Sequence, residues 1–376
     1  MGRPEKVRLG EILVQQKLLS EEQLKAALEE GKKSGRRLGR VVIEKGYVTE
    51  EKISEALARQ LNAPYIDLKH YNTRREVTLK LPETQARRFR ALVLEARGRA
   101  RPEVLLCDSY RKEGDDRATL TRLRRELHLD RYRCTTLLKA GDYQMLQVEA
   151  PSVPAEEAKN AVRWRIKDMV DFPVDTAAVD ALSIPAEGAA RNPQMFAVAA
   201  RNDVIAATVK PFNDSDIALE VVDIPELAQR NVAHFCEQEG RGLAFLAFDE
   251  GGGLLTLTSG GELYQYRRVD VSIASFGTAN PDQRRSLFDR IVLELQRSLD
   301  NFDRQFSHIA ISKLVVTQVP GADDLHDHLA ANLGLPVTWL ELSAIMDFPH
   351  VPELREPGHQ AQCLRMIGAA MREEAA

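Results

Sequence analysis

An internal repeat near the N-terminus constrains the fold of this chain more than any other feature of its sequence. The segment "RLGEILVQQKLLSEEQLKAALEEG" begins at Arg8, and "RLGRVVIEKGYVTEEKISEALARQ" begins at Arg37. The two segments align without a gap over 24 residues at an offset of 29, with seven identical positions. A self-similar unit of this size indicates one supersecondary element that is used twice.

Each copy carries the signals of a short amphipathic helix. Ser20 and Gln23 make a capping box for the first helix, and Thr49 can cap the second. Apolar residues then recur at helical spacing in both copies, and Gly31 with Gly35 supplies the stop. The apolar stripes are Leu24, Ala27 and Leu28 in the first copy and Ile53, Ala56 and Leu57 in the second. We therefore predict two helical units joined by the spacer "KKSGR".

The second Arg-Leu-Gly lies in a positively charged stretch. Five basic residues and no acidic residue fall between Lys32 and Arg40, which favours an anion. Glycine lets a ligand approach the backbone closely, and free amides at a helix N-terminus favour phosphate. Arginine can pair with guanine edges, stack on a base or bind phosphate. The repeat predicts a site for an anionic ligand with twofold symmetry. The alternative is a helical protein-docking module with apolar core positions and solvated arginines.

The paired units resemble the MshEN domain, the N-terminal domain of many type II secretion and type IV pilus assembly ATPases. That domain binds cyclic di-GMP through two 24-residue motifs separated by five residues. The resemblance covers about residues 8–68, and "LPETQARRFRAL" at 81–92 is similar to the closing element of such domains. It implies cyclic di-GMP binding by Arg8, Leu9, Gly10, Leu24, Leu28, Arg37, Leu38, Gly39, Ile53, Leu57 and Gln60. The first copy departs from the motif at Lys17, where the family has glycine, and at Gly31, where it has glutamine.

After a join rich in proline and charge at residues 69–101, strands alternate with helices. Apolar runs such as "EVLLCDS" and "YQMLQVEA" predict strands, and "RATLTRLRRELHL" predicts a helix. From Gly242 a second series begins with Gly-rich hairpins and continues into a long helix over 281–306. Trp164, Ile166 and Phe172 are interpreted as core or docking contacts. The pattern predicts three regions: an N-terminal domain at 1–85, a first α/β half with an inserted subdomain at 86–240, and a second half at 241–376.

This α/β portion resembles MshI, a pilus-biogenesis relative of PilM and of the cytoplasmic part of GspL. The likeness is carried by "GDYQMLQVEAPSVPAEEAKNAVRWRIKDMVDFPVDTAAVDAL" at 141–182, "LLTLTSGGELYQYRRVD" at 254–270, "LELQRSLDNFDRQFS" at 293–307 and the terminal "IGAAMREE". It implies an actin-like ATPase fold, which is a duplicated RNase H-like α/β architecture. It also implies a non-catalytic scaffold of a type IV pilus or type II secretion assembly platform. Its expected partners are the short cytoplasmic tail of a PilN- or MshJ-like membrane protein and the assembly ATPase.

Actin-like enzymes place an Asp-x-Gly turn after the first strand of each half, where backbone amides and a metal meet the phosphates. The second half offers "FDEGGG", so Asp249, Glu250, Gly251 and Gly252 are a candidate nucleotide-site remnant. A hairpin turn accounts for the same glycines. The first half has no such turn before residues 91–109, as if the N-terminal module had replaced its first strand. We expect no ATPase activity, with residual binding of ATP and magnesium left open. The alternative is an ATPase with Asp249 near the metal.

Composition argues against several other classes of protein. The net charge of −4 is against a general nucleic-acid binder, and no apolar run in the 376 residues is long enough to span a membrane. The first ten residues are too charged for a signal peptide, and Lys6 is against myristoylation. The four cysteines, interpreted as mostly buried cytosolic thiols without metal-ligand spacing, are Cys107, Cys134, Cys236 and Cys363. We expect a cytoplasmic protein without a metal site that reaches the bacterial inner membrane through partners.

Overall fold

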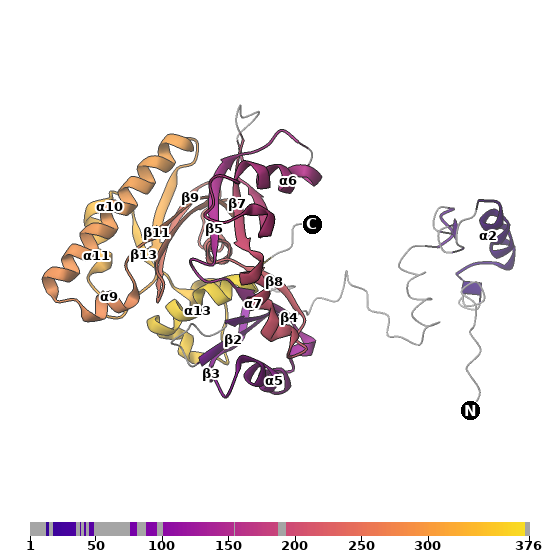
Figure 1. Ribbon diagram of the computed structural model, residues 1–376, viewed down its shortest axis with the longest axis horizontal. Coiled ribbons are helices and arrows are strands. Elements are labelled where there is room, and N and C mark those ends of the chain that lie inside the picture. The colour runs from indigo at the N-terminus through magenta and orange to yellow at the C-terminus, as the bar shows by residue number, and fades with distance from the viewer. Residues whose placement is uncertain are drawn as a thin grey trace. The chain divides into compact units, whose positions relative to one another are not determined.

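The chain forms two compact units, residues 1–72 and residues 73–376 (Figure 1). The computed structural model describes residues 13–14, 18–34, 38, 41–42, 45–48, 76–80, 88–95, 101–153, 155–186 and 193–372. The boundary between the units falls earlier than the predicted residue 85, because strand β1 (Glu76–Lys80) pairs with strands of the second unit.

The N-terminal unit is built around helix α2 (Glu21–Ser34). Its predicted capping box is confirmed: the Gln23 amide donates to Ser20 Oγ at 3.1 Å, and the Ser20 amide donates to Gln23 Oε1 at 2.9 Å. The described core of this unit is small and aliphatic. Its buried members are Leu13, Leu19, Ala27, Val41, Val42 and Val48. Of the predicted stripe on α2, Ala27 is therefore in the core, Leu24 is half-buried and Leu28 is 45% exposed.

The second unit contains two five-stranded sheets with the same strand order. The first sheet runs β3–β2–β1–β4–β8 and the second β11–β10–β9–β12–β13. In each sheet three antiparallel strands are joined to two parallel strands. The first sheet comprises β1, β2 (Arg88–Glu95), β3 (Glu103–Arg111), β4 (Arg133–Leu137) and β8 (Leu219–Asp223). The second comprises β9 (Gly242–Asp249), β10 (Gly252–Ser259), β11 (Glu262–Val269), β12 (Ile311–Val316) and β13 (Val337–Trp339). The shared order confirms the predicted duplication.

Two expectations about the start of the first half are wrong. The first strand of that half is present as β1, so the N-terminal unit has not replaced it. The segment 81–92, likened to the closing element of the N-terminal domain, instead leads into β2, whose register pairs Val93 with Val77 and with Leu106. Sequence reasoning missed β1 because the strand "EVTLK" is short and polar and forms only when long-range partners flank it.

Helices separate and cover the two sheets in five layers (Figure 1). Helices α5 (Asp116–Leu127) and α7 (Asn202–Asn213) contribute to the core on one face of the first sheet. Between the sheets lie α8 (Pro225–His234) and α13 (Pro357–Ala370), and the far face of the second sheet carries α9 (Ile273–Thr278), α10 (Pro281–Gln305) and α11 (Leu325–Leu333). Strand β2 illustrates how the first sheet is covered on both faces. Ala91 and Val93 pack toward α5, whereas Leu92 and Leu94 pack toward α13. Alternate residues of one strand thus enter two different cores.

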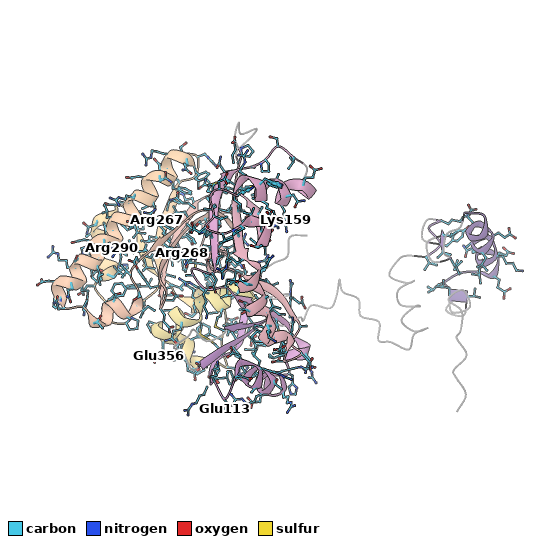
Figure 2. All side chains as sticks on the ribbon, in the orientation of Figure 1. Glu113, Lys159, Arg267, Arg268, Arg290 and Glu356 are labelled. Carbon is cyan, nitrogen blue, oxygen red and sulfur yellow. A yellow bond between two sulfur atoms is a disulfide. The ribbon has the colours of Figure 1, made fainter. Side chains whose placement is uncertain are left out.

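Helix α10 matches its predicted bounds to one residue. Asn280 and Gln283 form a capping box, with amide-to-oxygen distances of 2.9 and 3.0 Å, and Pro281 occupies the first helical turn. Ion pairs then connect the helix to strand β11 and the residue after it. Arg267 lies 2.7 Å from Glu294, and Arg290 lies 3.1 Å from Asp270 (Figure 2).

A small subdomain is inserted between β4 and α7. Its antiparallel sheet has the order β5–β7–β6, with β5 (Tyr143–Glu149), β6 (Ala177–Ser183) and β7 (Gln194–Arg201), and helix α6 (Ala155–Arg165) packs on it. Ile166 is fully buried in its core, while Trp164 is 65% exposed. Of the three residues interpreted as core or docking contacts, Ile166 lies in the core, Phe172 is half-buried against it and Trp164 lies on the surface.

The C-terminal segment returns to the first half. Asp347 exchanges backbone hydrogen bonds with its neighbours at the start of β3, receiving one from Val104 at 2.7 Å and donating one to Pro102 at 2.8 Å. Farther along, Cys363 of α13 forms a disulfide with Cys107 of β3, which corrects the prediction that all four cysteines are thiols. The remaining short elements are α12 (Leu342–Ile345) and the 3₁₀ helices η1 (Leu129–Arg131), η2 (Val174–Thr176) and η3 (Pro352–Arg355). None of the helices in the described ranges has the length and hydropathy needed to cross a bilayer.

Candidate functional site

The predicted nucleotide-site remnant is the turn of a β-hairpin. Asp249 ends β9 and pairs with Gly252, the first residue of β10, which leaves Glu250 and Gly251 as the two turn residues. The Gly251 amide donates to Asp249 Oδ1 at 2.7 Å, and Gly252 has a φ of 122°, which side-chain-bearing residues rarely adopt. The hairpin interpretation is confirmed.

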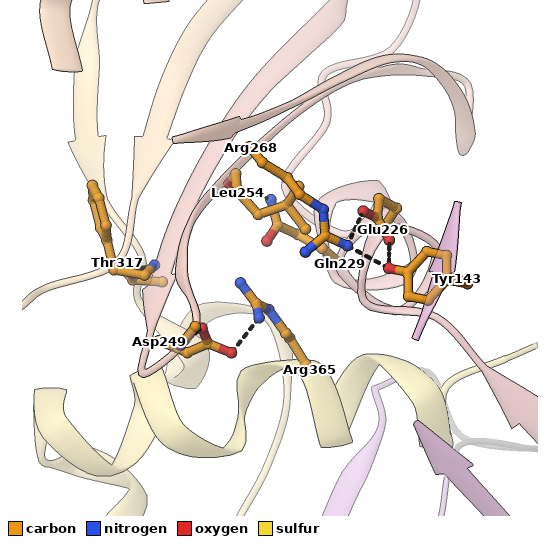
Figure 3. Close-up of polar contacts among 10 residues, drawn as sticks. Tyr143, Glu226, Gln229, Asp249, Leu254, Arg268, Thr317 and Arg365 are labelled. Carbon is orange, nitrogen blue, oxygen red and sulfur yellow. Dashed lines mark hydrogen bonds and ion pairs between the residues drawn. The ribbon is translucent and has the colours of Figure 1, made fainter. Parts of the chain in front are cut away.

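The carboxylate of Asp249 is occupied by an arginine of the C-terminal helix. Arg365 Nη1 contacts Asp249 Oδ2, and the two side chains are 15% and 18% exposed (Figure 3). Both oxygens of the carboxylate therefore already accept a hydrogen bond from the protein. A ligand at this turn would therefore have to compete with Arg365 for the Asp249 carboxylate.

A cavity of about 210 Å³ adjoins this ion pair. It is lined by the end of β4 with the loop that follows it, the first residue of α8, the β9–β10 turn and one face of α13. Pockets for drug-sized ligands span roughly 300–1,000 Å³, so the cavity is small for a nucleoside triphosphate. The corresponding turn of the first half lies outside the described residues. Its sequence, "LPETQAR" at 81–87, contains no glycine that would let phosphate approach the backbone.

A second buried cluster joins three parts of the unit. Glu226, in the first turn of α8, is fully buried and lies 2.6 Å from Arg268 of β11. The Tyr143 hydroxyl of β5 donates to the other oxygen of Glu226 and accepts from Arg268 at 2.5 Å (Figure 3). Burial raises the pKa of Tyr143, so the phenol keeps its proton and remains a donor. The cluster connects the inserted subdomain, a helix between the sheets and the second sheet.

Other buried polar groups at this junction are only partly satisfied, since Gln229 Oε1 and Asp223 Oδ2 have no hydrogen-bond partner among the described residues. Gln229 of α8 is fully buried, and its amide donates to the Phe245 and Leu254 carbonyls at 3.0 Å. Asp223 ends β8 and lies 3.2 Å from Arg372, and burial raises the pKa of its carboxyl. Within the described ranges no three His, Cys, Asp or Glu side chains are grouped so that they could hold a metal.

The structure describes part of the predicted cyclic di-GMP site. Leu24 and Leu28 lie on α2, the first half-buried and the second exposed, and Leu38 is half-buried against the small core. The others lie outside the described residues, as does the departure at Lys17; they are Arg8, Leu9, Gly10, Arg37, Gly39, Ile53, Leu57 and Gln60. The departure at Gly31 lies on α2.

Sequence reasoning missed Tyr143, Glu226, Arg268 and Arg365. Arg365 had a usable signal, since it interrupts the apolar run "CLRMIGAAM" of a helix that is otherwise buried. Glu226 had a weaker one, an acid at the first turn after Pro225. The partners of both lie too far along the chain, at separations of 116 and 42 residues, for any local pattern to reveal the pairs.

No protein-family model matches the chain, and no curated protein matches it by sequence. Solved structures do match by fold. A chain of the PilM–PilN type IV pilus biogenesis complex is 17% identical with a TM-score of 0.62, covering 79% of this chain and 99% of that chain. The cytoplasmic domain of EpsL, an inner-membrane component of the type II secretion system of Vibrio cholerae, is 15% identical, covering 80% and 96%, with a TM-score of 0.45. Given also its duplicated sheets, the second unit has the actin-like ATPase fold.

Proposed function

We propose that this protein is a non-catalytic cytoplasmic scaffold in the assembly platform of a type IV pilus or type II secretion system, regulated by cyclic di-GMP. The observation that carries the scaffold role is the ion pair between Asp249 and Arg365. An arginine side chain of α13 pairs with the carboxylate at the β9–β10 turn, where the sequence offered a nucleotide-site remnant. The protein itself therefore supplies a positive charge at this turn.

The partner follows from the fold likeness. The similar solved chain comes from a complex of PilM with PilN, so a PilN- or MshJ-like tail of an inner-membrane protein is the proposed partner of the second unit. Association with the inner membrane would then depend on that tail. The assembly ATPase is a further proposed partner.

Regulation by cyclic di-GMP rests on the repeated Arg-Leu-Gly motif and on the surface of α2. A purely structural role for the repeat's leucines would bury Leu28, yet Leu28 is 45% exposed while its neighbour Ala27 is fully buried. The helix thus presents to solvent an apolar side chain that the motif assigns to the ligand. In this proposal the ligand shifts the N-terminal unit toward one arrangement of its helices and so changes how the unit engages a partner.

Calorimetric titration of the full chain with cyclic di-GMP, and in parallel with magnesium–ATP, tests the proposal. We expect heat of binding with cyclic di-GMP and none with ATP. The double variant Arg8→Ala/Arg37→Ala should weaken binding by more than about tenfold, because two charge-assisted contacts are lost. Lys25→Ala removes an exposed charge on α2, outside the positively charged stretch at residues 32–40, and serves as the matched control. No heat in the wild type, or equal affinity in the double variant, would refute the sensor role.

A docking module without nucleotide is the second candidate, because the exposed Leu28 equally suits a protein contact. It predicts that the full chain retains an assembly ATPase on a column, that Leu28→Ala weakens retention, and that cyclic di-GMP changes nothing. The sensor proposal predicts instead that the ligand alters retention and that Leu28→Ala also weakens ligand binding. The two measurements together separate the candidates.

A further inference from the structure

The disulfide between Cys107 and Cys363 joins two parts of the chain separated by 256 residues. Cys107 lies on β3, the edge strand of the first sheet, and Cys363 lies in the middle of α13. Cys107 is half-buried, whereas Cys363 is only 4% exposed. Figure 1 shows α13 close to β2 and β3 at the side of the sheet that faces the other half.

Both sulfur-bearing residues line a cavity of about 290 Å³. Its other polar walls include Asp108, His350 and His359, and both histidines are exposed. A buried structural disulfide is normally enclosed by apolar side chains, which keep thiols away from it. Here both cysteines line a cavity that exposed polar residues also line and that is large enough for a cysteinyl side chain.

We propose that Cys107–Cys363 is a redox-active disulfide that a thiol reductant opens in the folded protein through this cavity. The other two cysteines do not compete with this disulfide for reaction with an external thiol or disulfide. Cys134 is buried, and burial raises the pKa of Cys236 to about 11, which keeps that thiol protonated and unreactive at neutral pH.

The reduction proceeds by thiol–disulfide exchange. A thiolate from the reductant attacks Sγ of Cys107, the more exposed of the two residues, forming a mixed disulfide and releasing Cys363 as a thiolate. Cys363 takes a proton from water. A second thiolate then attacks the sulfur that the reductant contributed, which releases Cys107 and the oxidised reductant. Two electrons pass from two reductant thiols to the two cysteines.

The disulfide lies where its reduction would affect how helix α13 is held between the two halves. Two residues after Cys363, Arg365 contacts Asp249 of the second half, so the disulfide and the ion pair hold adjacent positions of α13 to opposite halves of the unit. Opening the bond removes one of these two constraints. The inference rests on the proposed cytoplasmic location only for its source of reductant, since glutathione-class thiols are abundant there.

The test uses purified full chain without cyclic di-GMP or partner, so its outcome is independent of the sensor proposal. Folded protein is equilibrated in glutathione redox buffers, quenched by alkylation, and mapped by mass spectrometry. We expect Cys107 and Cys363 to become reduced together while the circular dichroism of the fold persists, and the thermal midpoint to fall by about 5 °C. Resistance to reduction until the protein unfolds, or no bond in the oxidising buffers, would overturn the proposal.

Two variants test which sulfur is attacked. In Cys363→Ser, oxidised glutathione should modify Cys107 readily and leave Cys134 unmodified. In the matched variant Cys107→Ser, Cys363 should react about tenfold more slowly, because it is nearly inaccessible. Equal rates in the two variants would contradict attack through the cavity at Cys107.

Discussion

At the scale of single residues, the junction between the two halves holds carboxylates that are buried because arginines reach them. Glu226 is the clearest case, since it is fully buried while its partner Arg268 keeps 39% of its side chain exposed. Removing either partner leaves the other without its opposite charge, although the Tyr143 hydroxyl still donates to Glu226 when Arg268 is removed. The two resulting charges differ, however, in how much water they retain.

This asymmetry predicts unequal costs for the two single substitutions. Arg268→Gln strands a fully buried carboxylate and should lower the free energy of unfolding by about 3–5 kcal/mol. Glu226→Gln leaves a guanidinium that is partly hydrated and should cost about 2 kcal/mol. Arg290→Gln, which breaks the exposed pair with Asp270, is the matched control and should cost less than about 1 kcal/mol. Urea unfolding at neutral pH measures all three, and the reverse order for Arg268 and Glu226 would contradict the analysis.

The pKa of Cys236 predicts a loss of stability at alkaline pH. Burial raises this pKa from 9.0 to about 11 in the folded state. The contribution is fully present below pH 9 and is lost as the pH rises through 11, because the unfolded chain ionises first. It amounts to about 2–3 kcal/mol. Urea unfolding at pH 8 and pH 11 should show a smaller loss for Cys236→Ala than for the wild type. An equal loss would mean that the thiol ionises alike in both states.

At the scale of elements, helices α8 and α13 cross so closely that one glycine is required. A Cβ on Gly368 would lie 1.8 Å from the Ala228 carbonyl oxygen, and the Asn231 side chain donates to the Gly368 carbonyl at 2.8 Å. No rotamer change can relieve a clash with backbone. The helices must therefore separate, and both sheets pack on them.

We expect Gly368→Ala to destabilise the second unit by about 3 kcal/mol or more, because the added methyl group forces the backbone apart. Gly358→Ala provides a control on the same helix, since its Cβ would meet only the Pro320 ring at 3.5 Å, an ordinary contact. That variant should be neutral or slightly stabilising. Thermal unfolding compares the two, and equal midpoints would show that the crossing can adjust.

Elements whose signals are local were predictable. The capping box at Ser20 and the hairpin at Asp249 depend on residues three or fewer positions apart, and the structure has them. Strand β1 was missed and the segment 81–92 was misassigned, because "EVTLK" becomes a strand only between β2 and β4. Of the N-terminal candidate site, the structure describes only residues on α2 and Leu38, so the ligand assignment stays a prediction.

At the scale of the whole molecule, the boundary at Asn72 and Thr73 predicts independent folding. Every strand of both duplicated sheets belongs to residues 73–376, so their cores are complete without the N-terminal unit. We expect the fragment 73–376 to unfold cooperatively, with a thermal midpoint within about 2 °C of that transition in the full chain. Differential scanning calorimetry decides the point. A fragment that fails to fold would show that the units depend on each other.

The sequence alone determined the features that depend on interactions between nearby residues. These are the repeat, the helix starts, the turn residues and the alternation of strands with helices. Such features arise from hydrogen bonds and periodicities within a few positions of the chain. Only the tertiary structure decided that Arg365 meets Asp249, that Arg268 meets Glu226 and that Cys107 meets Cys363. Each of these pairs joins residues that are far apart in the sequence and that come into contact only when the helices and sheets pack together. A charged side chain or a cysteine does not indicate, from its local sequence, which distant residue it will contact.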